Sequence, residues 1–307
     1  MKLTKTERTK MSKGMAIGAG LIAIIVAAVA AYAYISLQQN QIAETKTAKI
    51  AAFNIQIFGK TKSDKTDVMT ALTKIVREFD IVLIQEIRDA SEETIPNFIE
   101  KINQIEGATY SFIQSPRLGR TTSKEAYAYL YNTETVQFIQ GSDYVYTDTN
   151  DVFEREPYIA SFKIGNFDFV LAGIHIKPED AYNEIGNLTS VVSSIQTAKP
   201  KEKDIIIMGD FNADGSYFNE DDTSNLFKAS EYNWIITNDI DTTVKTDYTY
   251  DRIVVLDTTL NHEYNAGTAQ AFYFDQAYGL NNQTFVEEIS DHYPVFAQYK
   301  TNLEDDD

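Results

Sequence analysis

The chain has 307 residues, of which 43% are hydrophobic and 23% charged, so it can bury a core and is not a disordered polypeptide. It contains no cysteine, which excludes disulfide scaffolds, thiolate-bound metal sites and cysteine nucleophiles. Residues 1–40 hold five of the 27 basic and one of the 45 acidic residues, so the remainder has 22 basic and 44 acidic residues, a formal charge of −22. That acidity argues against a general basic surface for nucleic acid, but it does not exclude nucleic acid as a substrate.

Residues 15–37 form a run of 23 residues without a charged side chain. About 20 mostly apolar residues suffice for a helix to cross a bilayer. The five basic residues within positions 1–14 predict, by the positive-inside rule, that this segment stays in the cytoplasm. We therefore expect a transmembrane anchor at 15–37 and an extracytoplasmic body. The alternative is a cleaved signal peptide, since Ala31-Tyr32-Ala33 fits a cleavage site, and the body would then be secreted.

The rest of the chain divides into a linker, one folded domain and a tail. Residues 38–47 are polar and aperiodic, residues 48–302 alternate apolar β-rich runs with helical periodicity, and residues 303–307 are acidic. This alternation predicts a single α/β domain. The expected strands cover residues 49–58, 81–84, 110–114, 126–131, 158–164, 167–174, 204–208, 252–256 and 294–299. The expected helices cover residues 67–79, 93–105 and 179–195.

Several of these apolar runs end in residues that suit metal and phosphate chemistry. Each alone fits an ordinary turn, helix cap or packed imidazole, but together they follow a pattern, because ligand sites of α/β folds gather at strand ends. Oxygen ligands with no cysteine and only three histidines favour Mg²⁺, Mn²⁺ or Ca²⁺ over zinc. The residues are Asn54, Glu86, His175, Asp210, Asn212, Asp291 and His292.

The chemistry that this set suits is phosphodiester hydrolysis. A divalent ion held by Glu86 would neutralise phosphate charge, while Asp210 and Asn212 could orient the attacking water and bind a phosphate oxygen. Imidazoles titrate near neutral pH, so one histidine could accept the proton of water and the other could donate to the leaving oxygen.

Eight further segments stand in order along residues 49–300: IAAFNIQIFG (50–59), DIVLIQEIRDA (80–90), LGR (118–120), REP (155–157), IHIKPEDAYNEI (174–185), IIMGDFNADGSY (206–217), YDRIVV (250–255) and ISDHYPV (289–295). In this order they resemble the deoxyribonuclease I family of the endonuclease/exonuclease/phosphatase superfamily. The resemblance implies a four-layer α/β (α+β) sandwich, in which two packed mixed β-sheets are flanked by helices and the active site lies at one edge. The domain at 48–302 is then a deoxyribonuclease I-like catalytic domain.

The resemblance also implies a role for each site residue. His175 and His292 are the acid–base pair, oriented by the carboxylates of Glu125 and Asp251 respectively. Catalytic Mg²⁺ or Mn²⁺ is bound by Asn54 and Glu86, with Asp291 nearby, and Asp210 and Asn212 handle water and phosphate. The residues implied to contact DNA are Arg88, Arg155 and Tyr250.

Structural Ca²⁺ is implied at two loops, with Asp151, Phe153 and Glu156 in the first and Asp241 and Thr243 in the second. A solvated acidic loop is the alternative for each.

The chain departs from the family pattern at several positions. Gln56 replaces an arginine, Ser123 replaces a tyrosine that packs in the minor groove, and Gly215 replaces a disulfide cysteine. The first two changes should weaken contact with DNA. Residues 115–117 do not reproduce the actin-contacting stretch, so we expect no actin binding, and we expect a monomer.

The sequence thus favours a membrane-tethered, divalent-metal-dependent endonuclease that cuts mainly double-stranded DNA with little sequence preference. One alternative is a phosphodiesterase of the same superfamily that acts on a phospholipid such as sphingomyelin, or on RNA. The other is a non-catalytic binding domain on the same fold, which the complete set of catalytic residues disfavours.

Overall fold

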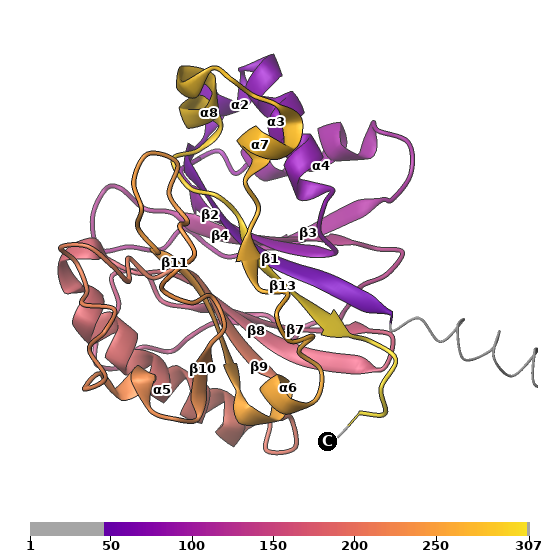
Figure 1. The fold of residues 1–307 in the computed structure, drawn as a ribbon. Coiled ribbons are helices and arrows are strands. Elements are labelled where there is room, and N and C mark those ends of the chain that lie inside the picture. Colours follow the sequence, from indigo (N-terminus) through magenta and orange to yellow (C-terminus); the bar gives the residue numbers. More distant parts are fainter. Residues whose placement is uncertain (1–45, 306–307) are drawn as a thin grey trace, which may run out of the picture. The chain divides into compact units, whose positions relative to one another are not determined.

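The first long strand shows how side-chain alternation builds the layers. The computed structural model describes residues 46–305, and β1 (Thr47–Phe58) is its first element (Figure 1). Ile50 and Ala52 point into one apolar cluster, and Ala51 and Phe53 point into another. Because successive side chains of a strand face opposite ways, a strand that is apolar on both faces needs a covering layer on each.

The sheet that contains β1 has six strands and is mixed. Its other strands are β2 (Ile81–Ile87), β3 (Tyr110–Gln114), β4 (Ala126–Asn132), β12 (Gln270–Ala271) and β13 (Val295–Lys300). Their order is β12-β13-β1-β2-β4-β3. The β1–β2 pair is parallel and the others are antiparallel.

The second sheet is also mixed. Its strands are β5 (Gln137–Phe138), β6 (Tyr144–Val145), β7 (Tyr158–Ile164), β8 (Phe167–His175), β9 (Ile205–Asp210), β10 (Tyr232–Trp234) and β11 (Asp251–Leu256). The order is β10-β11-β9-β8-β7-β5, and β6 pairs with β7 beside this path. The β8–β9 pair is parallel.

Helices cover the outer face of each sheet. The first sheet packs against α3 (Thr66–Val76), α4 (Thr94–Asn103), α7 (Phe274–Tyr278) and α8 (Gln283–Ile289), and the second against α5 (Ala181–Ala198) (Figure 1). Between the sheets, Ile50 and Leu83 of the first meet Phe162 and Met208 of the second in a shared core. These four layers confirm the predicted sandwich. The remaining short helices are α2 (Lys60–Ser63), η1 (Pro178–Asp180), η2 (Leu226–Lys228) and α6 (Asp257–Asn261).

The N-terminal predictions fall mostly outside the described residues. The predicted cytoplasmic segment at 1–14 and the predicted anchor at 15–37 lie there and stay predictions. Within residues 46–305, no helix is long and apolar enough to cross a membrane. From Thr47 onward the chain forms one compact unit, so β1 begins inside the predicted linker, one residue before the expected domain start.

Candidate active site

Three neighbouring strands carry polar residues to one edge of the second sheet. His175 is the last residue of β8 and lies opposite Asp210, the last residue of β9, in their parallel register. Asp251 is the first residue of β11 and lies opposite Asp210 in the antiparallel register. Because β11 begins where β8 and β9 end, the three side chains meet at one edge.

The first sheet contributes Asn54 and Glu86 to the same place. Asn54 Nδ2 donates to Glu86 Oε1 at 3.1 Å and to Asp210 Oδ2 at 3.0 Å, so one amide joins the polar ends of the two sheets. Ile57 N donates to Glu86 Oε2 at 2.8 Å and fixes the other carboxylate oxygen. The structure therefore brings together residues that lie more than 150 positions apart in the chain.

Backbone strain gathers at this edge. Gln56, Ile57, Glu86 and Asn212 have φ angles of 40°, 52°, 57° and 49°, in the left-handed region that side-chain-bearing residues rarely adopt. Strain of this kind costs about 1–3 kcal/mol per residue and is typical of functional sites, where the surrounding contacts impose it.

His175 forms one imidazole–carboxylate pair with Glu125. Its Nδ1 lies 2.8 Å from Glu125 Oε2, and both side chains are buried. Arg88 donates to Glu125 Oε1 through Nη2 at 2.7 Å and Nε at 3.1 Å, and Arg155 Nε lies 3.6 Å from Oε2. Burial opposes ionisation of Glu125, but the hydrogen bond to His175 and the two arginine charges outweigh it and lower its pKa to about 2. The ionised carboxylate in turn raises the pKa of His175, against burial and the Arg155 charge.

His292 forms the second pair, with Asp251. Its Nδ1 lies 2.8 Å from Asp251 Oδ2. Burial lowers the pKa of His292, but the charges of Asp251 and Asp210 outweigh burial and raise it to about 10. Burial raises the pKa of Asp251 only to about 6, so near neutral pH the proton of this pair resides on the imidazole.

The two pairs converge on Asp210. Its Oδ2 lies 3.5 Å from His175 Nε2 and 3.7 Å from His292 Nε2, so the free nitrogen of each imidazole faces the same oxygen. Asn212 N donates to Asp210 Oδ1 at 2.9 Å, which holds the carboxylate from the other side. Burial raises the pKa of Asp210, but the two imidazoles outweigh it and the net pKa is lowered.

Unpaired oxygen atoms at this edge fit a divalent cation. Asp210, Asp251 and His292 each offer one ligand atom within 4.8 Å of the others. Asp251 Oδ1 and Asp291 Oδ1 are buried without a hydrogen-bond partner. Gln56 links the predicted metal residues, because its backbone N donates to Asn54 Oδ1 at 2.9 Å and its side chain donates to Asp291 Oδ2 at 2.7 Å. Carboxylate and amide oxygens are ligands that Mg²⁺ and Mn²⁺ accept.

Comparison with known proteins gives the family of this site. Residues 51–292 match the Endonuclease/Exonuclease/phosphatase family. Deoxyribonuclease-1 of Bos taurus is 38% identical to the chain over 258 residues, which cover 80% of the chain and 90% of that protein. Deoxyribonuclease-1 of Homo sapiens is 36% identical over 264 residues, with coverages of 82% and 92%, and Deoxyribonuclease-1-like 1 of Cricetulus griseus is 35% identical over 263 residues, with coverages of 82% and 83%.

The chain belongs to the deoxyribonuclease I family. It is thus a deoxyribonuclease I-like hydrolase of the endonuclease/exonuclease/phosphatase superfamily. Solved structures show the same fold at lower identity. An endonuclease/exonuclease/phosphatase family protein from Bacteroides thetaiotaomicron has a TM-score of 0.56 at 15% identity and covers 84% of this chain and 99% of its own. The human Nocturnin catalytic domain with bound sulfate has a TM-score of 0.57 at 14% identity, with coverages of 82% and 94%.

The three residues that the family resemblance implies to contact DNA occupy different environments. Arg88 is half-buried and lies between Glu86 and Glu125, 3.2 Å from the first and 2.7 Å from the second. Arg155 is buried and donates from Nε to the backbone oxygen of His175 at 3.0 Å, so it supports the first imidazole pair. Tyr250 is half-buried, with its ring centroid 6.2 Å from that of His292.

Both predicted calcium loops adjoin the site, because Arg155 lies between Phe153 and Glu156 in the first and Thr243 pairs with His292 in an isolated β-bridge in the second. Asp151 is exposed and forms an ion pair with Arg120, while Phe153 is buried. Glu156 is half-buried, Asp241 is exposed, and the Thr243 hydroxyl bonds to Thr246. Within residues 46–305, the acidic and histidine side chains of these loops do not converge as a group of three. Calcium at either loop stays a prediction.

Two residues that contact the site have no role predicted from the sequence. Ser290 Oγ donates to Asn54 O at 2.6 Å and accepts from His292 N at 3.1 Å, so it links the segment that carries His292 to β1. Tyr127 OH accepts from His175 N at 2.9 Å. Ser290 stands inside the ISDHYPV segment, which could have indicated it, whereas Tyr127 is one of several tyrosines in β4 and carries no such signal.

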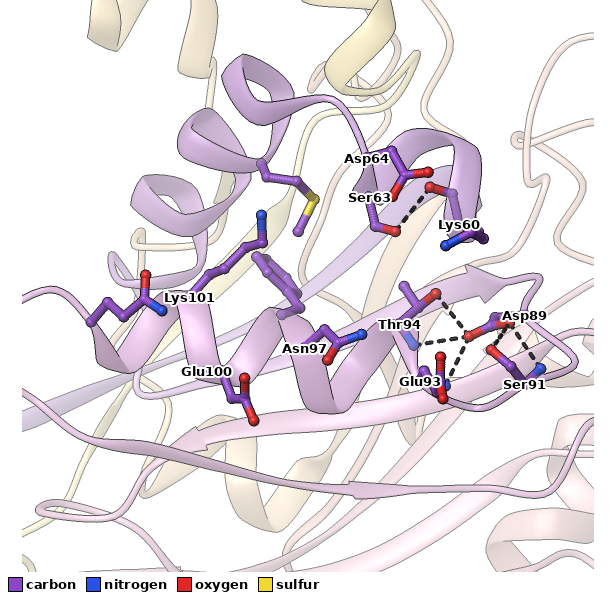
Figure 2. A pocket seen from close by; sticks show the side chains of 13 residues that line it. Lys60, Ser63, Asp64, Asp89, Ser91, Glu93, Thr94, Asn97, Glu100 and Lys101 are labelled. Carbon is purple, nitrogen blue, oxygen red and sulfur yellow. Dashed lines mark hydrogen bonds between the residues drawn. The ribbon is translucent and has the colours of Figure 1, made fainter.

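A separate pocket of about 270 Å³ lies between α2 and α4, and none of the predicted site residues lines it (Figure 2). Asp89 at its edge accepts hydrogen bonds from the backbone N of Ser91, Glu93 and Thr94 and from two hydroxyls, as Figure 2 shows. Burial raises the pKa of Asp89, but these hydrogen bonds outweigh burial and hold it well below its usual range. The carboxylate caps the start of α4, next to Arg88, and its oxygens are already engaged.

Proposed function

We propose that this chain is a divalent-metal-dependent endonuclease that hydrolyses phosphodiester bonds of DNA, mainly double-stranded and with low sequence specificity. The observation that carries the proposal is the convergence of two imidazoles, each oriented by its own carboxylate, on Asp210 Oδ2 at 3.5 and 3.7 Å. Two opposed imidazoles are the arrangement that in-line displacement at phosphorus needs, since a proton must leave the attacking water while another reaches the leaving oxygen.

In the proposed mechanism the two imidazoles transfer protons, and the neighbouring polar side chains orient them, the water and the phosphate. One imidazole accepts the proton of a water molecule positioned by Asp210, and the other donates a proton to the leaving sugar oxygen. Glu125 and Asp251 hold the ring tautomers and stabilise the imidazolium forms. Asn212 donates its amide to a backbone oxygen, that of Ile176, at 2.9 Å, which keeps its side chain in the site for a phosphate oxygen.

Glu86, Asn54 and Asp291 would hold Mg²⁺ or Mn²⁺. When bound, the ion neutralises charge on the phosphate and stabilises the transition state. The supporting observation is the buried, unpaired Asp291 Oδ1 on one side and the linked Asn54–Glu86 pair on the other.

The test compares substrates, metals and histidine variants of the full chain in detergent. Plasmid DNA, RNA and sphingomyelin are incubated with Mg²⁺ and Ca²⁺ or with EDTA. We expect plasmid nicking that EDTA abolishes and that His175→Ala and His292→Ala each reduce by about 10²–10⁴-fold. His262→Ala is the matched control, because this third histidine pairs with Glu263 and contacts no site residue.

Each outcome decides one part of the proposal. Intact plasmid in the presence of metal rejects the nuclease assignment, and release of phosphocholine from sphingomyelin would favour the lipid alternative. Plasmid cleavage that survives in a His175→Ala/His292→Ala double variant rejects the acid–base assignment while the substrate stands.

A further inference from the structure

Three tyrosine rings form a continuous group beside His292. Tyr250 lies at the centre, with its centroid 5.1 Å from Tyr248 in a stacked arrangement and 5.8 Å from Tyr217 in a tilted one. Tyr250 also lies beside the imidazole of His292, with 6.2 Å between the two ring centroids. Tyr217 is 40% exposed and the other two rings are half-buried, so the group presents aromatic surface at the rim of the site.

The loops that carry these rings are fixed against each other. Asp214 Oδ2 accepts from Thr249 N at 2.9 Å and joins the loop after β9 to the loop before β11. Gly215 has a φ of 64°, and a Cβ there would lie 3.2 Å from Tyr248 Cε1 and 3.4 Å from the Tyr250 hydroxyl. The Tyr248 ring therefore packs against Gly215, where there is no side chain, and its position is fixed before any substrate binds.

The charge around this group does not suit phosphate binding. Asp214 accepts a hydrogen bond from Thr249 N, and Asp251 directly follows Tyr250, so two carboxylates lie in the segments that carry the rings. Carboxylates repel a phosphodiester backbone, whereas the face of a neutral aromatic ring attracts a nucleobase regardless of net charge. Stacking on rings needs a base that is free of its partner, because the faces of paired bases within a duplex are already covered.

We propose that Tyr217, Tyr248 and Tyr250 form a stacking surface for an unpaired nucleobase of single-stranded DNA next to the cleaved bond. The proposal rests on the nuclease function above and adds to it: the site takes duplex DNA, and this surface gives it a second mode for strands with unpaired bases. Because an acidic body supplies little phosphate attraction, ring contacts make up a larger share of the affinity for a single strand.

The experiment measures kcat/KM for a fluorescent single-stranded dodecanucleotide of thymidine and for a duplex dodecamer, with Mg²⁺ and the full chain in detergent. Tyr248→Leu removes the aromatic face and still covers Gly215, and Tyr217→Ala removes an exposed ring. We expect each to lower the single-strand rate by about 5- to 100-fold through KM, the range for one lost base–ring contact, with a smaller effect on the duplex rate.

Two further variants separate stacking from structure. Tyr248→Phe keeps the ring and should keep the wild-type ratio of single-strand to duplex rates. Tyr232→Ala removes a half-buried ring at the far end of β11, opposite Leu256, and should leave that ratio unchanged.

If Tyr248→Leu and Tyr217→Ala lower both rates equally, or change neither, the stacking surface is rejected while the nuclease assignment stands. If the wild-type chain cuts neither DNA, the nuclease function itself fails.

Discussion

Glu125 is the residue on which the first imidazole pair depends. It is 1% exposed, and its two oxygens are shared among His175, Arg88 and Arg155. A buried carboxylate is stable in such a place only when cations surround it, and the same cations keep it ionised as pH falls. The site therefore holds a fixed negative charge behind His175, which sets the ring tautomer and stabilises the imidazolium.

Replacing Glu125 by Gln tests this role. The amide keeps the shape but loses the charge, so His175 loses the stabilisation of its protonated form. We expect kcat for plasmid nicking to fall by about 10²–10⁴-fold, as for comparable orienting carboxylates. Circular dichroism must show a folded chain, because Arg155 loses a buried partner. Glu134→Gln, in the exposed loop after β4, is the matched control and should keep wild-type kcat. A Glu125→Gln enzyme with wild-type kcat would contradict the orienting role.

At the scale of elements, much of the fold follows from the apolar runs. The strands predicted at residues 110–114 and 158–164 have those bounds in the structure, and the runs at 167–174 and 204–208 continue by one and two residues to place His175 and Asp210 at strand ends. The last three of these strands, β7, β8 and β9, are buried on both faces, so their hydrophobicity alone identifies them, whereas β3 is fully buried only at Tyr110. The four strands of two or three residues, β5, β6, β10 and β12, were not predicted, because their partners rather than their own sequence define them.

The site was predictable to a similar degree and for a related reason. Residues at strand ends meet because neighbouring strands are in register. Polar residues placed directly after apolar runs therefore indicate such a site. The burial of Arg155 and the bond from Gln56 to Asp291 depend on contacts between distant segments, over 235 positions in the second case, and the local pattern holds no sign of them.

Gly209 shows how tightly the strand ends fit together. It has a φ of 144°, and a Cβ there would lie 1.9 Å from Ile174 O and 2.7 Å from Gln85 Nε2. The backbone of β9 therefore approaches β8 and the first sheet at a distance that only glycine permits.

Gly209→Ala should destabilise the chain and disorder the site together. We expect a loss of about 3 kcal/mol or more in the free energy of unfolding by urea, since backbone must move. Gly141→Ala is the control: it also has a positive φ, of 76°, but nothing lies within 4 Å of its Cβ, so only about 1–2 kcal/mol should be lost. Equal losses in the two variants would show that the close approach in β9 has no energetic consequence.

At the scale of the whole molecule, a buried carboxyl group lies at each end of the second sheet. Asp210 is the last residue of β9, in the candidate active site, and Asp204 precedes the same strand at the opposite end. Asp204 is fully buried, with the side chains of Thr259 and Glu263 beside its carboxyl group. Burial, and the nearby carboxylates of Glu263 and Glu202, raise its pKa to about 8. The folded chain therefore binds a proton at Asp204 that the unfolded chain releases at a much lower pH.

This difference predicts how stability changes with pH. Between about pH 4 and 8 the folded state holds more protons at Asp204 than the unfolded state, so the contribution of this group to the free energy of unfolding falls as pH rises through this window. Asp204→Asn cannot ionise, and we expect its stability to fall less steeply than that of the wild type. By pH 8 the variant should be the more stable of the two, by an amount on the order of a few kcal/mol.

The measurement is urea unfolding of both chains at pH 4, 6 and 8, repeated in about 0.1 M and 1 M salt. High salt screens the repulsion among the exposed carboxylates of the −22 body, but it has little effect on a buried group. The difference between wild type and Asp204→Asn should therefore survive in high salt, whereas the slope common to both chains should shrink. Asp257→Asn, an exposed carboxylate in α6 at the same end of the sheet, should follow the wild type at every pH. Parallel pH profiles for the wild type and Asp204→Asn would show that the buried carboxyl group does not hold its proton above the usual range.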